Sequence, residues 1–338
     1  MEEPLVSICI PAYNGQAYLS SCLESALLQT YPNIEILLID DGSTDDTLSL
    51  AFTLAKKNNQ VRILQHPGQT GMVANWNNCI NQAKGEWIKF LFQDDLLDKF
   101  CVDKMLKACV RNNCQITICA RNIIIENSAG ETAREFFMNK AIHPEVIFTG
   151  KEFFNQHEVI ERVKPHLLDN ILGEPTSLFF NRNFAIETGL FIADMKQLVD
   201  YEFALRLILQ YGFSFIAEKL VSFRVHGSSV SNLKNKEPVK TISPESFDKI
   251  ILLCNYLYNH KFESLRNSAG GEYLLYYLQY MYGNACKKYG AKRIRKEITK
   301  FAESFPILNK LEYSFVDYQL KKYKVRAMTR KMQAYAVK

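Results

Sequence analysis

The sequence predicts an α/β protein with a mostly parallel sheet that carries helices on both faces. Short apolar runs alternate four times with helical patterns in about the first 95 residues, which is typical of crossover units. Hydrophobic residues make up 47% of the 338 residues and charged residues 23%, which excludes a disordered or fibrous protein. The length allows two modest domains, or one large domain with an appendage.

The first four strands and the helices between them follow in regular order. The expected strands are apolar runs at residues 5–10, 34–39, 61–65 and 87–92. The expected helices have apolar side chains at helical spacing, at residues 15–29, 44–58 and 71–84. Ser43 is a suitable N-cap for the second of these helices, with Asp46 at the spacing of a capping box.

The pattern is looser after Asp98. We expect a helix to about residue 113, a strand at 116–125, a loop at 127–149, a strand at 175–181, a helix at 198–211 and a strand at 213–225. Gly212 ends the last of these helices. The predicted organisation is a domain at 1–232, a polar linker at 233–246 and a helical, basic C-terminal region at 247–338.

Polar and acidic residues follow three of the predicted strands. In a parallel sheet, ligands bind at the carboxyl ends of the strands. Asp94 and Asp95 would repel each other unless a cation or hydrogen-bond donors offset their charge, and a divalent ion with oxygen ligands does so. The alternative is a pair of acids at a helix N-terminus. For Asp40 and Asp41 the alternative is an ordinary strand-to-helix turn, and Tyr13 either stacks on a base or packs.

Several segments, taken in this order, resemble glycosyltransferase family 2, and the resemblance spans roughly residues 4–232. The segments are 6–14 (VSICIPAYN), 29–36 (QTYPNIEI), 39–45 (IDDGSTD), 85–91 (GEWIKFL), 93–95 (QDD), 173–177 (GEPTS), 199–207 (VDYEFALRL) and 223–231 (FRVHGSSVS). The resemblance implies the GT-A fold, a mixed and mostly parallel sheet flanked by helices. It also implies transfer of a sugar from a nucleotide diphosphate donor, with inversion at the anomeric carbon.

The resemblance also implies roles for single residues. Asp200 would be the catalytic base, and Asp95 would hold a divalent cation, Mg²⁺ or Mn²⁺, with His226 as a further candidate ligand. Asp41 would accept a hydrogen bond from a uracil-type base, and Asp94 would face the ribose or the sugar. The other expected donor-binding residues are Pro11, Ala12, Tyr13 and Asn14.

Some features argue for other interpretations. Phe92 stands where many members have an Asp, and Trp76 where the family often has an Arg, which favours a non-catalytic nucleotide-sugar-binding module as the alternative function. By itself Asp200 would more often be a helix N-cap, and His226 a turn histidine. A dinucleotide oxidoreductase is disfavoured because no GxGxxG follows the first strand.

Charge is distributed unevenly along the chain. The formal net charge is +5, and residues 287–338 contain 15 Lys or Arg against 4 Asp or Glu. This region predicts either a solvated helix face or a peripheral contact with anionic lipid, and without a recognition motif no nucleic-acid partner is expected.

The nine cysteines form no CxxC pair and no secretory leader precedes Val6, so we expect a cytoplasmic protein. The expected partners are a nucleotide-sugar donor and a saccharide or lipid-linked acceptor.

Overall fold

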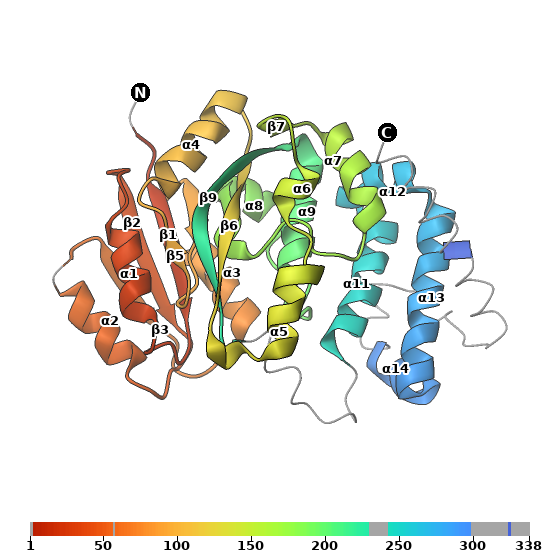
Figure 1. Ribbon diagram of the computed structural model, residues 1–338, viewed down its shortest axis with the longest axis horizontal. Coiled ribbons are helices and arrows are strands. Elements are labelled where there is room, and N and C mark those ends of the chain that lie inside the picture. The colour runs from red at the N-terminus through yellow and green to blue at the C-terminus, as the bar shows by residue number, and fades with distance from the viewer. Residues whose placement is uncertain (1–2, 57, 230–242, 299–323, 326–338) are drawn as a thin grey trace.

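The computed structural model describes residues 3–56, 58–229, 243–298 and 324–325. Within them the chain forms one sheet in the order β3-β2-β1-β4-β8-β6-β9-β5, with β7 paired to β9 (Figure 1). The strands are β1 (Val6–Ala12), β2 (Ile34–Asp40), β3 (Val61–Gln65), β4 (Trp87–Phe90), β5 (Leu96–Leu97), β6 (Ile116–Ile125), β7 (Phe153–Phe154), β8 (Leu178–Asn181) and β9 (Phe213–Val225).

The sheet is mixed. Strands β3, β2, β1 and β4 run parallel to one another, and β6 runs parallel to β9. Strand β8 is antiparallel to both β4 and β6, and the short strands β5 and β7 are antiparallel to β9. The predicted fold class is therefore confirmed: a mixed, mostly parallel sheet flanked by helices.

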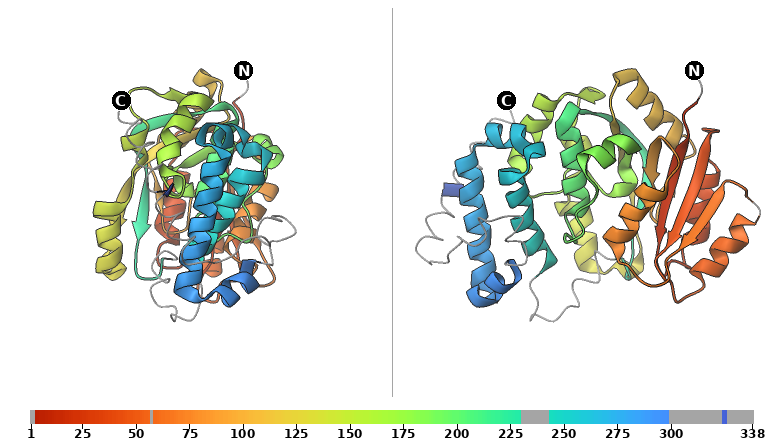
Figure 2. Two further views of the ribbon diagram at one scale, coloured as in Figure 1. Left: turned by 90° about the vertical axis from the view of Figure 1, so that its right-hand side faces the viewer. Right: turned by 180° about the vertical axis from the view of Figure 1, so that it is seen from behind.

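Helices cover both faces of this sheet. Side chains of α1 (Leu19–Leu27), α2 (Thr47–Ala55) and α4 (Cys101–Asn112) share a core with Ile8 and Leu38, on the face that is in front in Figure 1. Side chains of α3 (Met72–Gln82) share a second core with Cys9 and Leu37 on the other face, which is seen from behind in Figure 2. Neighbouring residues of β1 and β2 thus face different cores, which explains their continuous apolar runs.

The helical C-terminal part packs into the second of these cores. Its helices are α11 (Pro244–Tyr258), α12 (Glu263–Ala269), α13 (Gly271–Tyr289) and α14 (Ala291–Ile298). They stand together at one end of the molecule in both figures. Buried residues of α11, α13 and α14 belong to the same hydrophobic cluster as those of α3 and α9 (Val199–Tyr211). The region expected to be helical is therefore continuous with the core of the sheet. Most of the expected linker at 233–246 and most of the basic tail lie outside the described residues.

Some predicted elements have different bounds. Strand β8 begins at Leu178, because Pro175–Ser177 form a 3-10 turn and a proline has no N–H for a strand ladder.

The expected loop at 127–149 contains short helical segments: η1 (Asn127–Ala129), α5 (Glu131–Glu135), the π-helical η2 (Phe136–Lys140) and α6 (Pro144–Ile147). Three of their side chains, Ala129, Ala133 and Phe137, pack on Val225 of β9. The remaining elements are α7 (Gln156–Val163), the turns η3 (Lys164–His166) and η6 (His260–Phe262), and α8 (Arg182–Thr188).

Candidate functional site

The loops that follow β1, β2 and β4 meet at one edge of the sheet, as the strand order requires. The Asp41 N–H donates to the Ala12 carbonyl over 2.8 Å, and the two strands pair up to Ala12 and Asp40. The Gln93 side chain exchanges two hydrogen bonds with the Tyr13 backbone, at 2.8 and 2.9 Å. Three segments that are far apart in the sequence therefore form one polar edge, which we call the strand-end edge (residues 11–14, 40–43 and 93–95).

Four predicted residues lie at the end of β1. Pro11 and Ala12 are buried in the last part of the strand, whereas Tyr13 is 39% exposed and Asn14 is exposed. Asn14 has a φ of 50°, a left-handed conformation that asparagine tolerates. Its side-chain oxygen accepts from the Thr44 N–H at 2.8 Å. Tyr13 and Asn14 are thus the two members of this set that a ligand can reach directly.

Asp41 is almost fully buried beneath a neighbouring loop. One carboxylate oxygen accepts from both the N–H and the hydroxyl of Thr70, at 2.7 and 2.6 Å. The other oxygen accepts from the Gly71 N–H at 2.9 Å. Asp41 therefore ties the strand-end edge to the loop that precedes α3.

The adjacent carboxylates Asp94 and Asp95 have different surroundings. Asp95 has no exposed surface, and its oxygens accept from the Thr176 hydroxyl and, at 2.9 Å, from the Arg224 N–H. Burial, and after it the charge of Asp94, raises the pKa of Asp95 well above its usual value. The side chain of Asp94 is 22% exposed, and its Oδ2 lies 3.0 Å from Nε2 of His226. Asp94 therefore supplies the accessible carboxylate of the pair.

His226 lies in a compact polar network. Its Nδ1 is 2.9 Å from the Ser228 hydroxyl, and its ring centroid is 4.6 Å from that of Tyr18. The Tyr18 hydroxyl donates to Glu126 over 2.8 Å, and a guanidinium nitrogen of Arg224 is 3.1 Å from the same carboxylate. The hydrogen bond from Tyr18 is the main cause of a lowered pKa at Glu126, and burial is the main cause of a raised pKa at Tyr18. The network holds the imidazole beside Asp94.

Asp200 is the second residue of α9. The N-cap of this helix is Leu198, so the interpretation of Asp200 as an N-cap is wrong. Its Oδ1 accepts from the Tyr201 N–H at 2.8 Å, and its Oδ2 accepts from the Asn170 side-chain amide at 3.3 Å. The same amide donates to the Gly173 carbonyl at 3.1 Å. Asp200 is therefore attached to the loop that begins at Gly173.

The loop at 173–177 connects Asp200 to the strand-end edge. At one end Gly173 shares Asn170 with Asp200, and near the other end Thr176 donates to Asp95. Asp95 and Asp200, which are far apart in the sequence, are thus connected to the same short stretch of chain. Asn170, Thr176, Arg224, Glu126 and Tyr18 were not predicted as site residues. Thr176 and Arg224 lie in two of the family-like segments, at 173–177 and 223–231, and for the other three no local pattern marks a role.

The two departures from the family pattern are neighbours. The rings of Trp76 and Phe92 are 4.9 Å apart between centroids, and Trp76 also meets Phe191 at 5.3 Å. Trp76 is 8% exposed and Phe92 is partly buried. Next to Asp94, at the end of β4, this chain therefore has an aromatic pair.

The donor atoms of Asp94 and His226 suit a divalent cation. Carboxylate oxygen and imidazole nitrogen are ligands for Mn²⁺, and Mg²⁺ takes carboxylate together with substrate phosphates. Among the described residues no three His, Cys, Asp or Glu side chains come together as a metal cluster. A cation at this pair would therefore take its remaining ligands from a bound diphosphate or from water.

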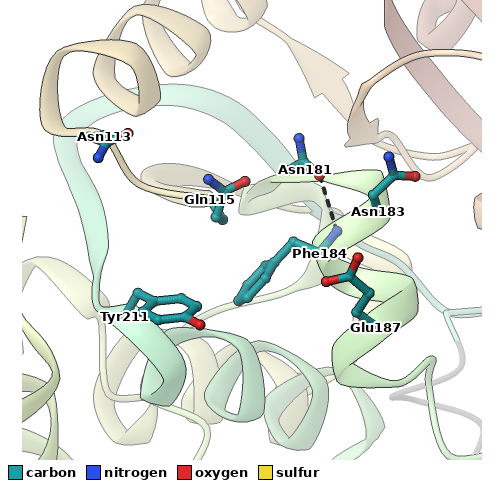
Figure 3. A pocket seen from close by; sticks show the side chains of 7 residues that line it. All are labelled: Asn113, Gln115, Asn181, Asn183, Phe184, Glu187 and Tyr211. Carbon is teal, nitrogen blue, oxygen red and sulfur yellow. Dashed lines mark hydrogen bonds between the residues drawn. The ribbon is translucent and has the colours of Figure 1, made fainter.

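A hollow of about 450 Å³ lies away from these residues. Figure 3 shows its lining, where the Asn181 side chain accepts from the Phe184 N–H at 3.1 Å. Asn181 pairs with Trp87, the first residue of β4, whereas the site residues follow the last one. A second hollow, of about 510 Å³, lies between residues 16–17 and α2. Neither hollow contains a predicted site residue.

Comparison with known proteins identifies the family of this chain. The family model described as Glycosyl transferase family 2 matches residues 7–172. An uncharacterized glycosyltransferase of Haemophilus influenzae is 31% identical over 183 residues, which cover 54% of this chain and 72% of that protein. The chain belongs to glycosyl transferase family 2. It is thus a glycosyltransferase, as the sequence predicted.

Two solved structures share the fold of this family 2 glycosyltransferase. The crystal structure of Staphylococcus aureus TarS 1–349 with UDP-GlcNAc matches with a TM-score of 0.61 and 15% identity, over 95% of this chain and 91% of that one. The mannosyltransferase PcManGT of Pyrobaculum calidifontis, solved with GDP-Man and Mn²⁺, matches with a TM-score of 0.56 and 13% identity, over 99% and 88% of the two chains. Both similarities establish the GT-A fold.

Proposed function

We propose that this glycosyltransferase moves a sugar, with inversion, from a uridine or thymidine diphosphate donor to a hydroxyl of a saccharide or lipid-linked acceptor. The observation that carries the proposal is the attachment of Asp200 and Asp95 to the two ends of one short loop. That arrangement places Asp200 apart from Asp94 and Asp95, which lie at the end of β4 where the donor would bind. The solved complex of a structural neighbour with UDP-GlcNAc supports this donor class.

The nucleotide would bind at the strand-end edge. The exposed Tyr13 ring would stack on the base, with Asn14 beside it and the buried Pro11 and Ala12 supporting this loop from beneath. Asp41 would accept the base N–H: a carboxylate offers about four lone-pair sites, and three donors already use Asp41. One site therefore remains for a uracil-type base.

For the cation we propose that Asp94 takes the role that the sequence assigned to Asp95. Asp94 with His226 would hold Mg²⁺ or Mn²⁺, which would offset the negative charge that develops on the departing diphosphate. Asp95 is enclosed by Thr176 and Arg224, so it would position the end of β4 instead of contacting the cation. The neighbour solved with Mn²⁺ supports a divalent cation in this fold.

Asp200 would be the catalytic base. A hydroxyl is a poor nucleophile until a carboxylate takes its proton, which typically contributes 10²- to 10⁴-fold to the rate. Asn170 donates to Oδ2 of Asp200 and Tyr201 donates to Oδ1, so the carboxylate is oriented before the acceptor arrives. One base and one displacement give inversion of the anomeric carbon.

The basic C-terminal region would contact the inner surface of a membrane. In α14 the side chains of Lys292, Arg293, Arg295 and Lys296 are exposed, whereas Ile294 is buried. Exposed basic residues near anionic lipid contribute about 1 kcal/mol each. No described helix is long and apolar enough to cross a bilayer. On the basis of these exposed basic residues we propose a peripheral membrane contact. We also propose a cytoplasmic location, in a pathway that builds a polysaccharide or glycoconjugate.

The test is nucleotide release from a panel of UDP-, dTDP- and GDP-sugars with Mn²⁺, using the full chain. Asp200→Asn should lower turnover about 10²- to 10⁴-fold and leave UDP binding unchanged. Asp194→Asn, at an exposed aspartate before α9, is the matched control. Full turnover by Asp200→Asn would refute the assignment of the base. No release from any donor would favour a nucleotide-sugar-binding module.

A further inference from the structure

A buried carboxylate from the C-terminal helices contacts the segment that leads into Asp200. Asp248 of α11 has no exposed surface, and its two oxygens accept from three consecutive backbone N–H groups. The Oδ2 distances are 3.0 Å to Lys196, 2.5 Å to Gln197 and 2.9 Å to Leu198. A buried charge is tolerated only where such donors replace water. The contact thus fixes the chain at residues 196–198.

This segment ends at the start of α9. Leu198 is the N-cap of the helix, and Asp200 follows two residues later. The first N–H groups of a helix have no partner within it, so the direction of its first turn depends on how the preceding residues are held. At α9 no side chain caps the helix, and Asp248 holds the N-cap residue itself through its N–H.

Helix α11 also holds the chain on the other side of Asp200. The Tyr256 hydroxyl donates to the Leu167 carbonyl at 2.8 Å. Leu167 lies three residues before Asn170, whose amide donates to Oδ2 of Asp200. Tyr201, the next residue of α9, donates through its hydroxyl to the His166 carbonyl at 3.2 Å. Both backbone segments that orient the Asp200 carboxylate are therefore attached to one helix outside the stretch matched by the family model.

We propose that Asp248 is a positioning residue for Asp200, and that the C-terminal helices are in this way part of the catalytic apparatus. The inference rests on the proposed role of Asp200 as the base. Asp248 would act through the backbone of residues 196–198 and would not contact the donor. Replacement of its side chain should therefore affect turnover and leave nucleotide binding intact.

The test compares Asp248→Asn with the wild-type full chain. An asparagine replaces one carboxylate oxygen by an NH₂ group, which cannot accept a hydrogen bond. In place of Oδ1 this group would face the Lys196 N–H, and in place of Oδ2 it would face the Gln197 and Leu198 N–H groups. We expect turnover, measured as UDP release from UDP-N-acetylglucosamine, to fall about 10- to 100-fold, because a small misplacement of a reacting group costs that much. The dissociation constant of UDP should not change. Glu245→Gln, at a half-exposed acid on the same helix, is the matched control.

Two further measurements separate positioning from a general loss of structure. Amide hydrogen exchange should accelerate at residues 196–201 in Asp248→Asn and stay unchanged in β1, β2 and β4. The double variant Asp200→Asn/Asp248→Asn should be about as slow as Asp200→Asn alone, since residues that act as a unit are not additive.

Each outcome decides the inference. Unchanged exchange at 196–201, unchanged turnover, or losses that multiply in the double variant would overturn it. Weakened UDP binding would show a general defect and overturn it as well. If the wild type releases no UDP with any sugar nucleotide, the proposed function fails, and the exchange measurement alone still decides whether Asp248 holds the Asp200 segment.

Discussion

At the strand-end edge, the loops that follow neighbouring strands form hydrogen bonds with one another. Asp200, in contrast, is oriented by side chains from distant parts of the chain. Gln93 binds the backbone of Tyr13, and Asp41 donates its N–H to Ala12, all at positions where β1, β2 and β4 end. Asn170 contacts Asp200, and Asp248 contacts the segment before it. The proposed donor side, which is the strand-end edge, is thus a direct consequence of sheet topology. The proposed acceptor side, around Asp200, depends on polar contacts from distant parts of the chain.

The largest expected effect tests this dependence on buried polar contacts. In α9, Arg206 donates to Glu202 at 2.8 Å, with side chains 3% and 0% exposed, and to the carbonyls of residues 188–190. Arg206→Met would leave the Glu202 charge buried without its partner. We expect the free energy of unfolding to fall by about 3–5 kcal/mol. Urea denaturation followed by circular dichroism measures it.

The control for this change is an exposed ion pair away from the helices at the acceptor side. Arg111 is 63% exposed and lies 2.9 Å from Glu152. Arg111→Met should cost less than about 1 kcal/mol, because water screens an exposed pair. Equal losses of unfolding free energy in Arg111→Met and Arg206→Met would show that the buried ion pair of α9 contributes no more than the exposed one.

The next effect separates the two adjacent carboxylates. Asp94→Ala should lower the affinity for UDP at least about 10-fold with Mn²⁺ present, and change it little without metal. In Asp95→Ala, Mn²⁺ should still increase the affinity for UDP. The free energy of unfolding should fall by about 1–3 kcal/mol, because the buried Thr176 hydroxyl and Arg224 N–H lose their acceptor. Isothermal titration with UDP measures the first quantity, and urea denaturation the second.

The reverse pattern would restore the assignment made from the sequence. A loss of the Mn²⁺ effect in Asp95→Ala, with Asp94→Ala unaffected, would place the cation at Asp95. A loss of the Mn²⁺ effect in both variants would mean that Asp94 and Asp95 contribute to cation binding together.

The convergence of the strand ends could be predicted because it follows from alternation alone. Once strands at 5–10, 34–39 and 87–92 are recognised, a parallel order brings their carboxyl ends to one edge. The two carboxylates that follow β4 could not be told apart in the same way. Whether a residue beyond a strand points into the core or toward solvent depends on the loop, and here Asp95 points toward Thr176, 81 residues further along the chain.

Local capping rules were a poor guide at both helices beside the site. The Ser43 hydroxyl donates to Asp40 instead of capping a helix, and α2 begins at Thr47 with Asp46 as its N-cap. At α9 the N–H groups before the helix are satisfied by Asp248, about 50 residues away along the chain. A contact between residues far apart in the sequence leaves no periodic pattern in it. Neither Asp248 nor Asn170 could therefore be predicted.

The smallest expected effect concerns the hydrogen bond from Tyr18 to Glu126, in the network beside the proposed cation ligand His226. This bond, aided by Arg224, lowers the pKa of Glu126 below its ordinary value of 4.5. A carboxylate with a lowered pKa stabilises the folded state above its ordinary pKa, and this contribution is lost as the pH falls through the lowered value. Tyr18→Phe keeps the ring against His226 and removes the donor.

At pH 7 we therefore expect Tyr18→Phe to lower the free energy of unfolding by about 1 kcal/mol, a value at the lower end for a charged acceptor because Glu126 is partly exposed. The difference from wild type should shrink below pH 4.5, where Glu126 takes up its proton. Tyr13→Phe, at the exposed tyrosine of the same edge, should show neither effect. Urea denaturation at a series of pH values measures both variants. A difference that persists undiminished to pH 3 would mean that the ionised Glu126 does not hold Tyr18, and that the donor side depends on strand ends alone.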